Sequence, residues 1–137
     1  MLRRVYKTRR GIAIVELAVV LPVLILITLI TVDWARVFYY SVTLSSAARQ
    51  GAIYGADPIA AANSRFHSAQ EAALAETTNL NPAPTVTIAT GNDVDGNPYT
   101  QATVTWTFST VTHYPGISNT VNLSRTVRMR VAPITPG

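Results

Sequence analysis

A single apolar segment, residues 11–32, restricts what this chain can fold into more than any other feature of its sequence. The segment holds one charged residue, Glu16, and one proline, Pro22. An α-helix rises about 1.5 Å per residue, so just over 20 residues cross a hydrocarbon layer of about 30 Å. The segment therefore predicts a membrane-spanning helix that carries a carboxylate near its start.

The positive charge of the chain is concentrated in front of this segment. Five of the eleven lysines and arginines lie within the first ten residues, whereas the rest of the chain carries six cations and seven anions. Because lysine and arginine stay on the cytoplasmic side, we expect a cytoplasmic N-terminus, one pass through the bacterial inner membrane and an extracytoplasmic C-terminal domain. The near-neutral remainder argues against a nucleic-acid partner, and its one basic group (Arg125, Arg128 and Arg130) is expected on a solvated strand face.

The helix is expected to continue beyond the membrane. No glycine or proline follows the apolar segment before Gly51, so one helix is predicted from about Ile12 to about Tyr54. Asp33 and Arg36 are spaced i,i+3 and are predicted to pair on one helix face. The aromatic residues predicted for the outer membrane interface are Trp34, Tyr39 and Tyr40.

Three small residues, Ala47, Gly51 and Gly55, recur at every fourth position in the upper part of this helix. Such a row allows another helix to approach closely. Alternatively, the two glycines only loosen and end the helix, because glycine is unfavourable in a helix interior. The sequence leaves both interpretations open.

One more helix and a small sheet are predicted beyond Ala56. Asp57 and Pro58 are suited to cap and begin a helix, which the apolar spacing extends to about Thr77. Three later segments alternate apolar and polar residues, as strands with one buried face do: 85–90, 100–112 and 121–131. The amphipathic face of the second helix is expected to cover this sheet, and the upper part of the first helix is a further candidate.

The predicted fold is therefore α+β, with a long N-terminal transmembrane helix, a second short helix and a small three-stranded antiparallel sheet. We expect a basic leader at residues 1–11 and a transmembrane and protruding helix at residues 12–56. An extracytoplasmic α+β domain is expected at residues 57–137.

No catalytic or metal-binding pattern accompanies these elements. Cysteine is absent, and neither His67 nor His113 has a second ligand at binding spacing. The segment 93–97 fails as a calcium loop because Ala102 stands where the terminal glutamate belongs. It predicts a hairpin turn instead, with Asp95-Gly96 at the tip. We expect no enzymatic activity, no metal and no cofactor.

The junction between the leader and the apolar segment suits proteolytic processing. A protease that cuts after Gly11, where a missing side chain fits a narrow site, leaves a free ammonium group on Ile12. A carboxylate in hydrocarbon costs roughly a few kcal/mol and needs a partner, and this ammonium group, from the same or a neighbouring subunit, is a suitable one for Glu16. Alternatively, Glu16 extends toward the inner headgroups. Pro22 either lets the helix bend during extraction from lipid or is a tolerated membrane proline.

Residues from about Arg9 to Ala56 resemble the TadE-like family of tight-adherence (Flp, type IVc) pilus systems. The matching pieces are Arg10-Gly11, Glu16-Leu17, Val20-Leu21-Pro22-Val23-Leu24, Arg36, Tyr39-Tyr40 and Ala47-Ala48-Arg49-Gln50-Gly51-Ala52. The resemblance implies a minor pilin or pseudopilin that a prepilin peptidase cleaves after Gly11, with Glu16 as the assembly glutamate. Leu17 stands where major pilins of these systems usually carry tyrosine, which favours a minor component.

These observations predict a membrane-anchored protein that assembles, initiates or caps a tight-adherence pilus. Its expected partners are the inner membrane, a prepilin peptidase, other pilins or pseudopilins and the pilus assembly platform. One alternative is an uncleaved single-pass envelope protein whose small domain binds a ligand or partner. A second is a secreted domain released by a signal peptidase, although the apolar segment is too long for an ordinary signal peptide.

Overall fold

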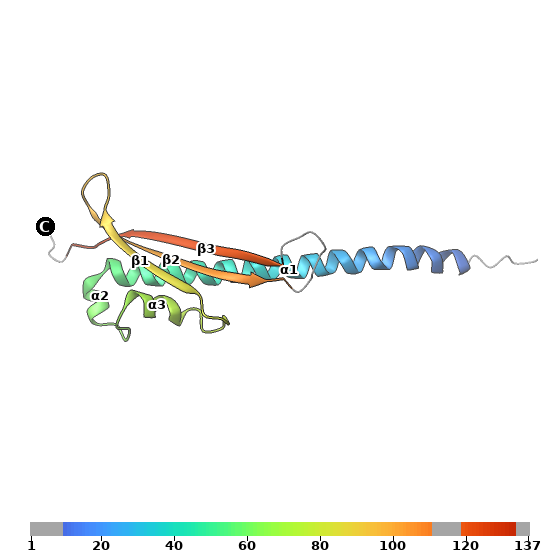
Figure 1. Ribbon diagram of the computed structural model, residues 1–137, viewed down its shortest axis with the longest axis horizontal. Helices are drawn as coiled ribbons and strands as arrows, with labels where there is room; N and C mark the ends of the chain where they lie inside the picture. The colour runs from blue at the N-terminus through green and yellow to red at the C-terminus, as the bar shows by residue number, and fades with distance from the viewer. Residues whose placement is uncertain (1–9, 111–118, 134–137) are drawn as a thin grey trace, which may run out of the picture.

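The computed structural model describes residues 10–110 and 119–133. The leader cations before Arg10 and most of the loop predicted at residues 113–120 lie outside these described residues. The first element is α1 (Arg10–Ala56), a helix of 47 residues and thus about 70 Å long. It continues without interruption past Pro22. Its first half stands alone, and all other elements lie beside its second half (Figure 1).

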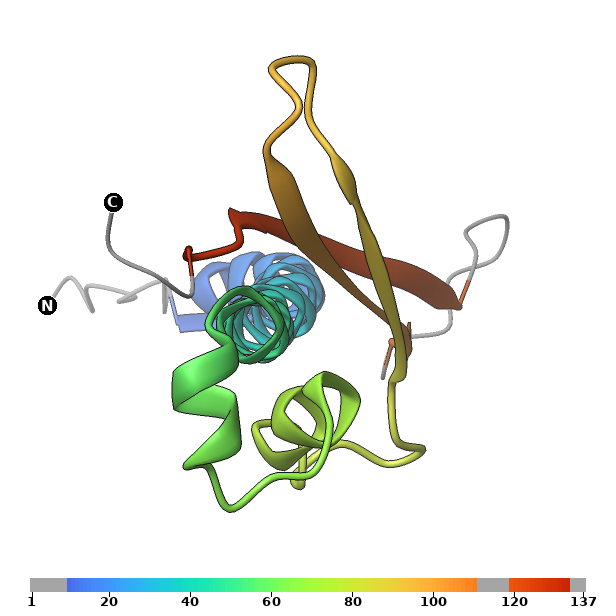
Figure 2. The ribbon, with the colours of Figure 1, turned by 90° about the vertical axis from the view of Figure 1, so that its left-hand side faces the viewer.

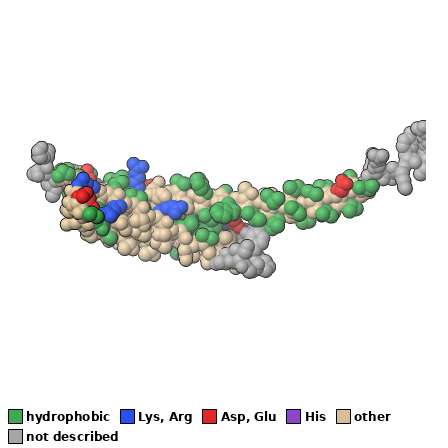
Figure 3. Space-filling view, turned by 90° about the horizontal axis from the view of Figure 1, so that it is seen from above, with side chains coloured by type: hydrophobic (Ala, Val, Ile, Leu, Met, Phe, Trp, Pro, Cys, Tyr) green, Lys and Arg blue, Asp and Glu red, His purple; other side chains and the backbone are tan. Residues whose placement is uncertain are grey.

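The first half of α1 has the character of a membrane anchor. Among the described residues, α1 is the one helix that is long and apolar enough to cross a membrane. Its large apolar side chains are exposed on every side, as Ile14 (68%), Val20 (49%) and Leu24 (52%) illustrate. Figure 3 shows hydrophobic side chains along this protruding part. A helix that is apolar all round requires an apolar environment that the chain itself does not supply.

A three-stranded antiparallel sheet packs on the second half of α1 in the order β1-β2-β3. The strands are β1 (Thr85–Asn92), β2 (Pro98–Ser109) and β3 (Thr120–Arg130). Val86 pairs with Val104, and Trp106 pairs with Leu123, so the apolar positions fall on one face. Gly96 has a φ of +80° at the tip of the β1–β2 hairpin, a backbone conformation that glycine adopts at little cost. The predicted fold class, the antiparallel sheet and the turn at Asp95-Gly96 are confirmed.

The prediction of one continuous second helix is wrong. The segment forms two short helices, α2 (Pro58–Ala62) and α3 (Ala69–Ala75). Ser68 caps α3 by accepting a hydrogen bond from the Glu71 amide at 3.0 Å, and the Glu71 carboxylate accepts one from the His67 amide at 2.8 Å. These two hydrogen bonds start a new helix at Ser68. The apolar residues on either side of this start therefore do not lie on one face of a single helix. Ile59 on α2 is accordingly 57% exposed.

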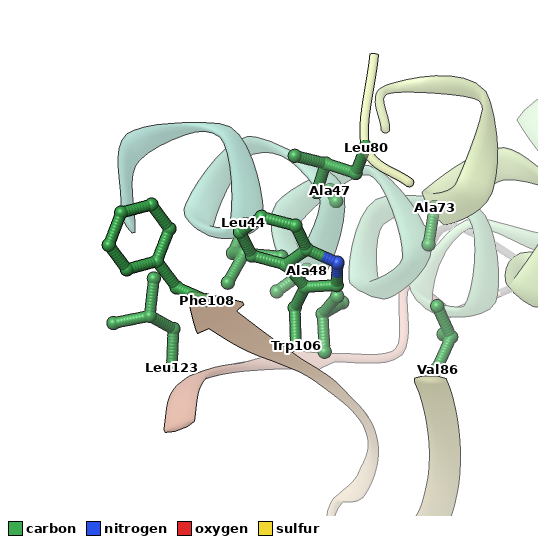
Figure 4. Close-up of a cluster of buried hydrophobic side chains, with 10 residues drawn as sticks. Leu44, Ala47, Ala48, Ala73, Leu80, Val86, Trp106, Phe108 and Leu123 are labelled. Carbon is green, nitrogen blue, oxygen red and sulfur yellow. The ribbon is translucent and has the colours of Figure 1, made fainter. Parts of the chain in front are cut away.

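The hydrophobic core is shared between α1 and the sheet. Leu44, Ala47 and Ala48 of α1 are fully buried and contact a cluster that includes Val104, Trp106 and Phe108 of β2 (Figure 4). Viewed along α1, the sheet passes above and to the right of the helix, and α3 lies below it (Figure 2). The core therefore contains residues from both sides of the boundary predicted between residues 56 and 57.

Candidate functional site

The residues predicted for processing and assembly lie on the exposed first half of α1. Ile12 is 65% exposed, and Glu16 lies one helical turn further along. A Cβ atom built on Gly11 would meet no atom within 4 Å. The fold therefore places no requirement on the residue type at position 11.

Glu16 differs from the other polar side chains of the apolar segment. The hydroxyls of Thr28 and Thr31 donate hydrogen bonds of 2.8 Å to the carbonyls of Leu24 and Ile27, so the helix itself satisfies them. Among the side chains described within residues 11–110 and 119–133, no cation lies at ion-pairing distance from Glu16. In hydrocarbon, the carboxylate of Glu16 consequently needs a partner from elsewhere.

The membrane-proximal end of the domain is held by a charged pair. Arg36 Nη1 lies 3.7 Å from Asp33 Oδ1, which confirms the predicted i,i+3 pair. The Arg36 guanidinium carbon also lies 4.8 Å from the centroid of the Phe108 ring, a cation–π contact. Asp33 is only 7% exposed. Through the contact of Arg36 with Phe108, the pair joins the end of the apolar segment to the end of β2.

The predicted aromatic belt needs correction. Trp34 is 70% exposed and remains suited to the membrane interface. The Tyr40 ring instead packs against the rings of Trp106 and Phe108, with centroids 4.8 Å and 5.4 Å apart. The Tyr39 hydroxyl accepts a hydrogen bond from the Asn79 side chain at 3.4 Å. Of the three residues, Tyr40 belongs to the domain's packing and not to a belt.

The row of small residues is covered by the chain itself. A Cβ on Gly51 would lie 3.1 Å from the Ala69 carbonyl oxygen and 3.2 Å from the Cβ atoms of Ala73 and Ala102. A Cβ on Gly55 would overlap the Thr100 side chain, whose hydroxyl donates a 2.9 Å hydrogen bond to the Gly55 carbonyl. Ala47 is fully buried. The helix that approaches this row is α3 of the same chain, so the row is not available to a second subunit.

Arg125 was predicted on a solvated strand face together with Arg128 and Arg130. Arg125 lies instead on the side of β3 that faces α1, and its Nη2 donates a 3.0 Å hydrogen bond to the Ser41 hydroxyl. Arg128 lies over the Tyr99 ring, 3.4 Å from its centroid. Arg125 lies two residues from both Leu123 and Val127, which face inward. Strand alternation therefore predicts from the sequence that Arg125 lies on the same side of β3.

The hairpin tip is stabilised by the side chain of Asp93. Asp93 Oδ1 accepts hydrogen bonds from the amides of Asn97 (2.8 Å) and Asp95 (3.0 Å). The Asn97 amide is the main cause that lowers the pKa of Asp93 below its ordinary value of 3.8, and the Arg130 charge adds to it. Among the described residues, no three metal-binding side chains come together.

A family model described as TadE-like protein matches residues 11–52. The N-terminal region is therefore TadE-like. The match confirms the predicted resemblance and begins at Gly11, the residue predicted to precede the cut. The TadE-like region comprises the apolar segment and most of the upper half of α1, and it ends before α2.

The TadE-like match indicates a membrane protein related to the tight-adherence pilus. It covers less than half of the 137 residues, and the sheet lies outside it. No curated protein and no solved structure matches the chain.

Proposed function

We propose that this protein is a minor pilin or pseudopilin that assembles, initiates or caps a tight-adherence pilus. In this proposal the leader stays in the cytoplasm, α1 crosses the inner membrane, and the sheet lies outside. The protein is a substrate of a prepilin peptidase and not itself an enzyme. Its other partners are pilins or pseudopilins and the assembly platform.

The observation that carries the proposal is that Gly11, at the start of the TadE-like region, has no neighbouring atoms that require a glycine. Gly51 and Gly55 touch neighbouring atoms that explain why they are glycines, whereas no atom lies within 4 Å of a Cβ at Gly11. A glycine that packing does not require, at the end of a basic leader, suits recognition by another protein. A peptidase that binds extended backbone in a narrow site would require glycine at this position, because a larger side chain would not fit.

Glu16 supports the same proposal. The Ile12 ammonium group that cleavage creates lies one turn away along the helix, or reaches Glu16 from a neighbouring subunit. Pairing offsets the cost of a carboxylate in hydrocarbon, roughly 2.5–3.5 kcal/mol at a helix centre on insertion scales. In this account Pro22 allows α1 to adjust when it leaves the membrane, because a proline removes one backbone hydrogen bond of the helix.

N-terminal sequencing of the mature protein tests the proposal. With the peptidase present, the mature chain should begin at Ile12, and Gly11→Leu should abolish cleavage because its side chain fills the site. Ala18→Leu adds the same side chain at another exposed position and should be cleaved normally. A retained leader in the wild type would favour the uncleaved envelope protein instead. Normal cleavage of Gly11→Leu would contradict processing by a peptidase that requires glycine at this position.

A further inference from the structure

An open groove of about 320 Å³ lies between α1 and β3, next to the end of the apolar segment. Trp34, Phe38 and Val42 of α1 line it on one side, and Arg125 of β3 lines it on the other. The exposed fractions of the three apolar side chains are 70%, 73% and 54%. Their spacing of four residues places them on one helix face, and this face continues the exposed apolar surface of residues 11–32.

Arg125 is a positioned cation in this groove. Its Nη1 donates to the Ser124 carbonyl at 3.1 Å, and its Nη2 donates to Ser41 at 3.0 Å. Across residues 10–110 and 119–133, no carboxylate lies at ion-pairing distance from Arg125. The guanidinium carries five N–H donors, so several of them remain for an anion at the groove. Such a fork suits the oxygens of a phosphate group.

The length of the apolar segment favours a tilt of α1 in the membrane. Residues 11–32 span about 33 Å as a helix, which exceeds a hydrocarbon thickness of about 30 Å, and membrane helices tilt by about 20° on average. Ser41, next to Arg125, lies about 13 Å along the helix beyond Val32. A tilt toward the groove lowers Phe38 and Arg125 toward the membrane, whereas a tilt in the opposite direction raises them.

We propose that this groove is a docking surface for phospholipid headgroups of the leaflet on the domain's side. Trp34 and Phe38 enter the interfacial layer, Arg125 binds a lipid phosphate, and the contact fixes the direction in which α1 leans. The proposal requires that α1 crosses a membrane, but it is independent of cleavage and of a pilus role.

The order of groups along the groove favours lipid over a second copy of the chain. An apolar segment, then aromatic residues, then a cation match the hydrocarbon, interfacial and phosphate layers of a bilayer. A second α1 helix offers no suitable anion, because Asp33 is the only acid of α1 beyond the apolar segment and it is 7% exposed and paired with Arg36.

Nitroxide labels test the proposal in the full-length chain, which has no native cysteine. Phe38→Cys and Tyr39→Cys place labels at nearly the same height but about 100° apart around the helix. The proteins are reconstituted in vesicles of phosphatidylcholine with phosphatidylglycerol, and depth is measured from collisions with oxygen and with a water-soluble nickel chelate. The label at position 38 should lie about 4 Å deeper than the label at position 39, from a tilt of about 20–30°.

Arg125→Gln should reduce the depth of the label at position 38 by at least half of that difference. This comparison uses only the label at position 38, with and without Arg125→Gln, so it does not depend on how Tyr39→Cys affects the protein. Arg128→Gln removes a cation from the opposite face of β3 and should leave the depth unchanged. Equal depths at positions 38 and 39 would overturn the proposal. Spin–spin broadening at position 38 with protection from both reagents would also overturn it, and would indicate that a second copy fills the groove.

Discussion

The two halves of α1 are built from similar apolar residues but meet different surroundings. Leu29 in the lower half is 41% exposed, whereas Leu44 in the upper half is fully buried. A Cβ at Gly11 meets nothing, whereas a Cβ at Gly55 overlaps Thr100. Packing within the chain explains the buried residues of the upper half, such as Leu44 and Gly55. Packing among the described residues gives no such reason for Gly11, Glu16 and Pro22 in the lower half, so we expect the membrane and other proteins to determine them.

The largest expected difference between the halves concerns leucine truncation. Leu44→Ala should lower the free energy of unfolding by about 2–5 kcal/mol, because it leaves a cavity in the shared core. Leu29→Ala should change it by less than about 0.5 kcal/mol, because no core surrounds that side chain. Denaturant unfolding of the detergent-solubilised protein, followed by the circular dichroism of the sheet, measures both. Equal losses for the two variants would contradict the comparison.

A smaller difference is expected between the two glycines. Gly55→Ala should destabilise the domain by about 1–3 kcal/mol, because the new methyl group displaces Thr100 and strains its hydrogen bond to the Gly55 carbonyl. Gly11→Ala should not destabilise the protein, since alanine favours helices by up to about 1 kcal/mol. The same unfolding assay applies, and a stable Gly55→Ala variant would show that the row tolerates side chains.

The smallest effect concerns the hairpin tip, which lies far from both halves. The Asp93 carboxyl should titrate below its ordinary pKa of 3.8, since the Asn97 and Asp95 amides bind its ionised form. A lowered folded-state pKa stabilises the turn above the unfolded-state pKa, and this contribution is lost as the pH falls through the folded-state value. NMR titration of the carboxyl carbon measures the pKa. A value at or above 3.8 would contradict the hydrogen bonding described here.

The sequence was sufficient to predict the elements that a strong period defines. The apolar segment predicted α1 to within two residues at each end, and strict alternation predicted the three strands, because side chains of a strand alternate between faces. Between Pro58 and Thr77 the apolar spacing is weaker, and it predicted one helix where a second helix starts at Ala69. There Ser68 caps the start of α3, and Glu71 accepts a hydrogen bond from the His67 amide just before the cap. These local bonds determine the break.

Partners within the fold were harder to predict than elements. A row of small residues specifies a close approach but not which segment approaches, so the row ending at Gly55 did not reveal α3 and β2 as its neighbours. Tyr40 lies close enough to the apolar segment to suit a membrane interface, but its ring packs against Trp106 of β2. Such tertiary contacts depend on how the sheet lies on α1, which no local pattern encodes.

The most direct test of the account replaces Glu16 and measures stability and assembly together. Glu16→Ala should unfold like the wild type and should insert and be cleaved normally, but it should fail to crosslink to other pilus subunits and should support few or no pili. Glu16→Asp should be intermediate because its side chain is shorter. Thr28→Ala removes a polar group that its own helix already satisfies, and it should assemble normally. The measurement is piliation and crosslinking in a deletion strain at matched protein levels. Wild-type piliation by Glu16→Ala would contradict the claim that the lower half of α1 is maintained for assembly.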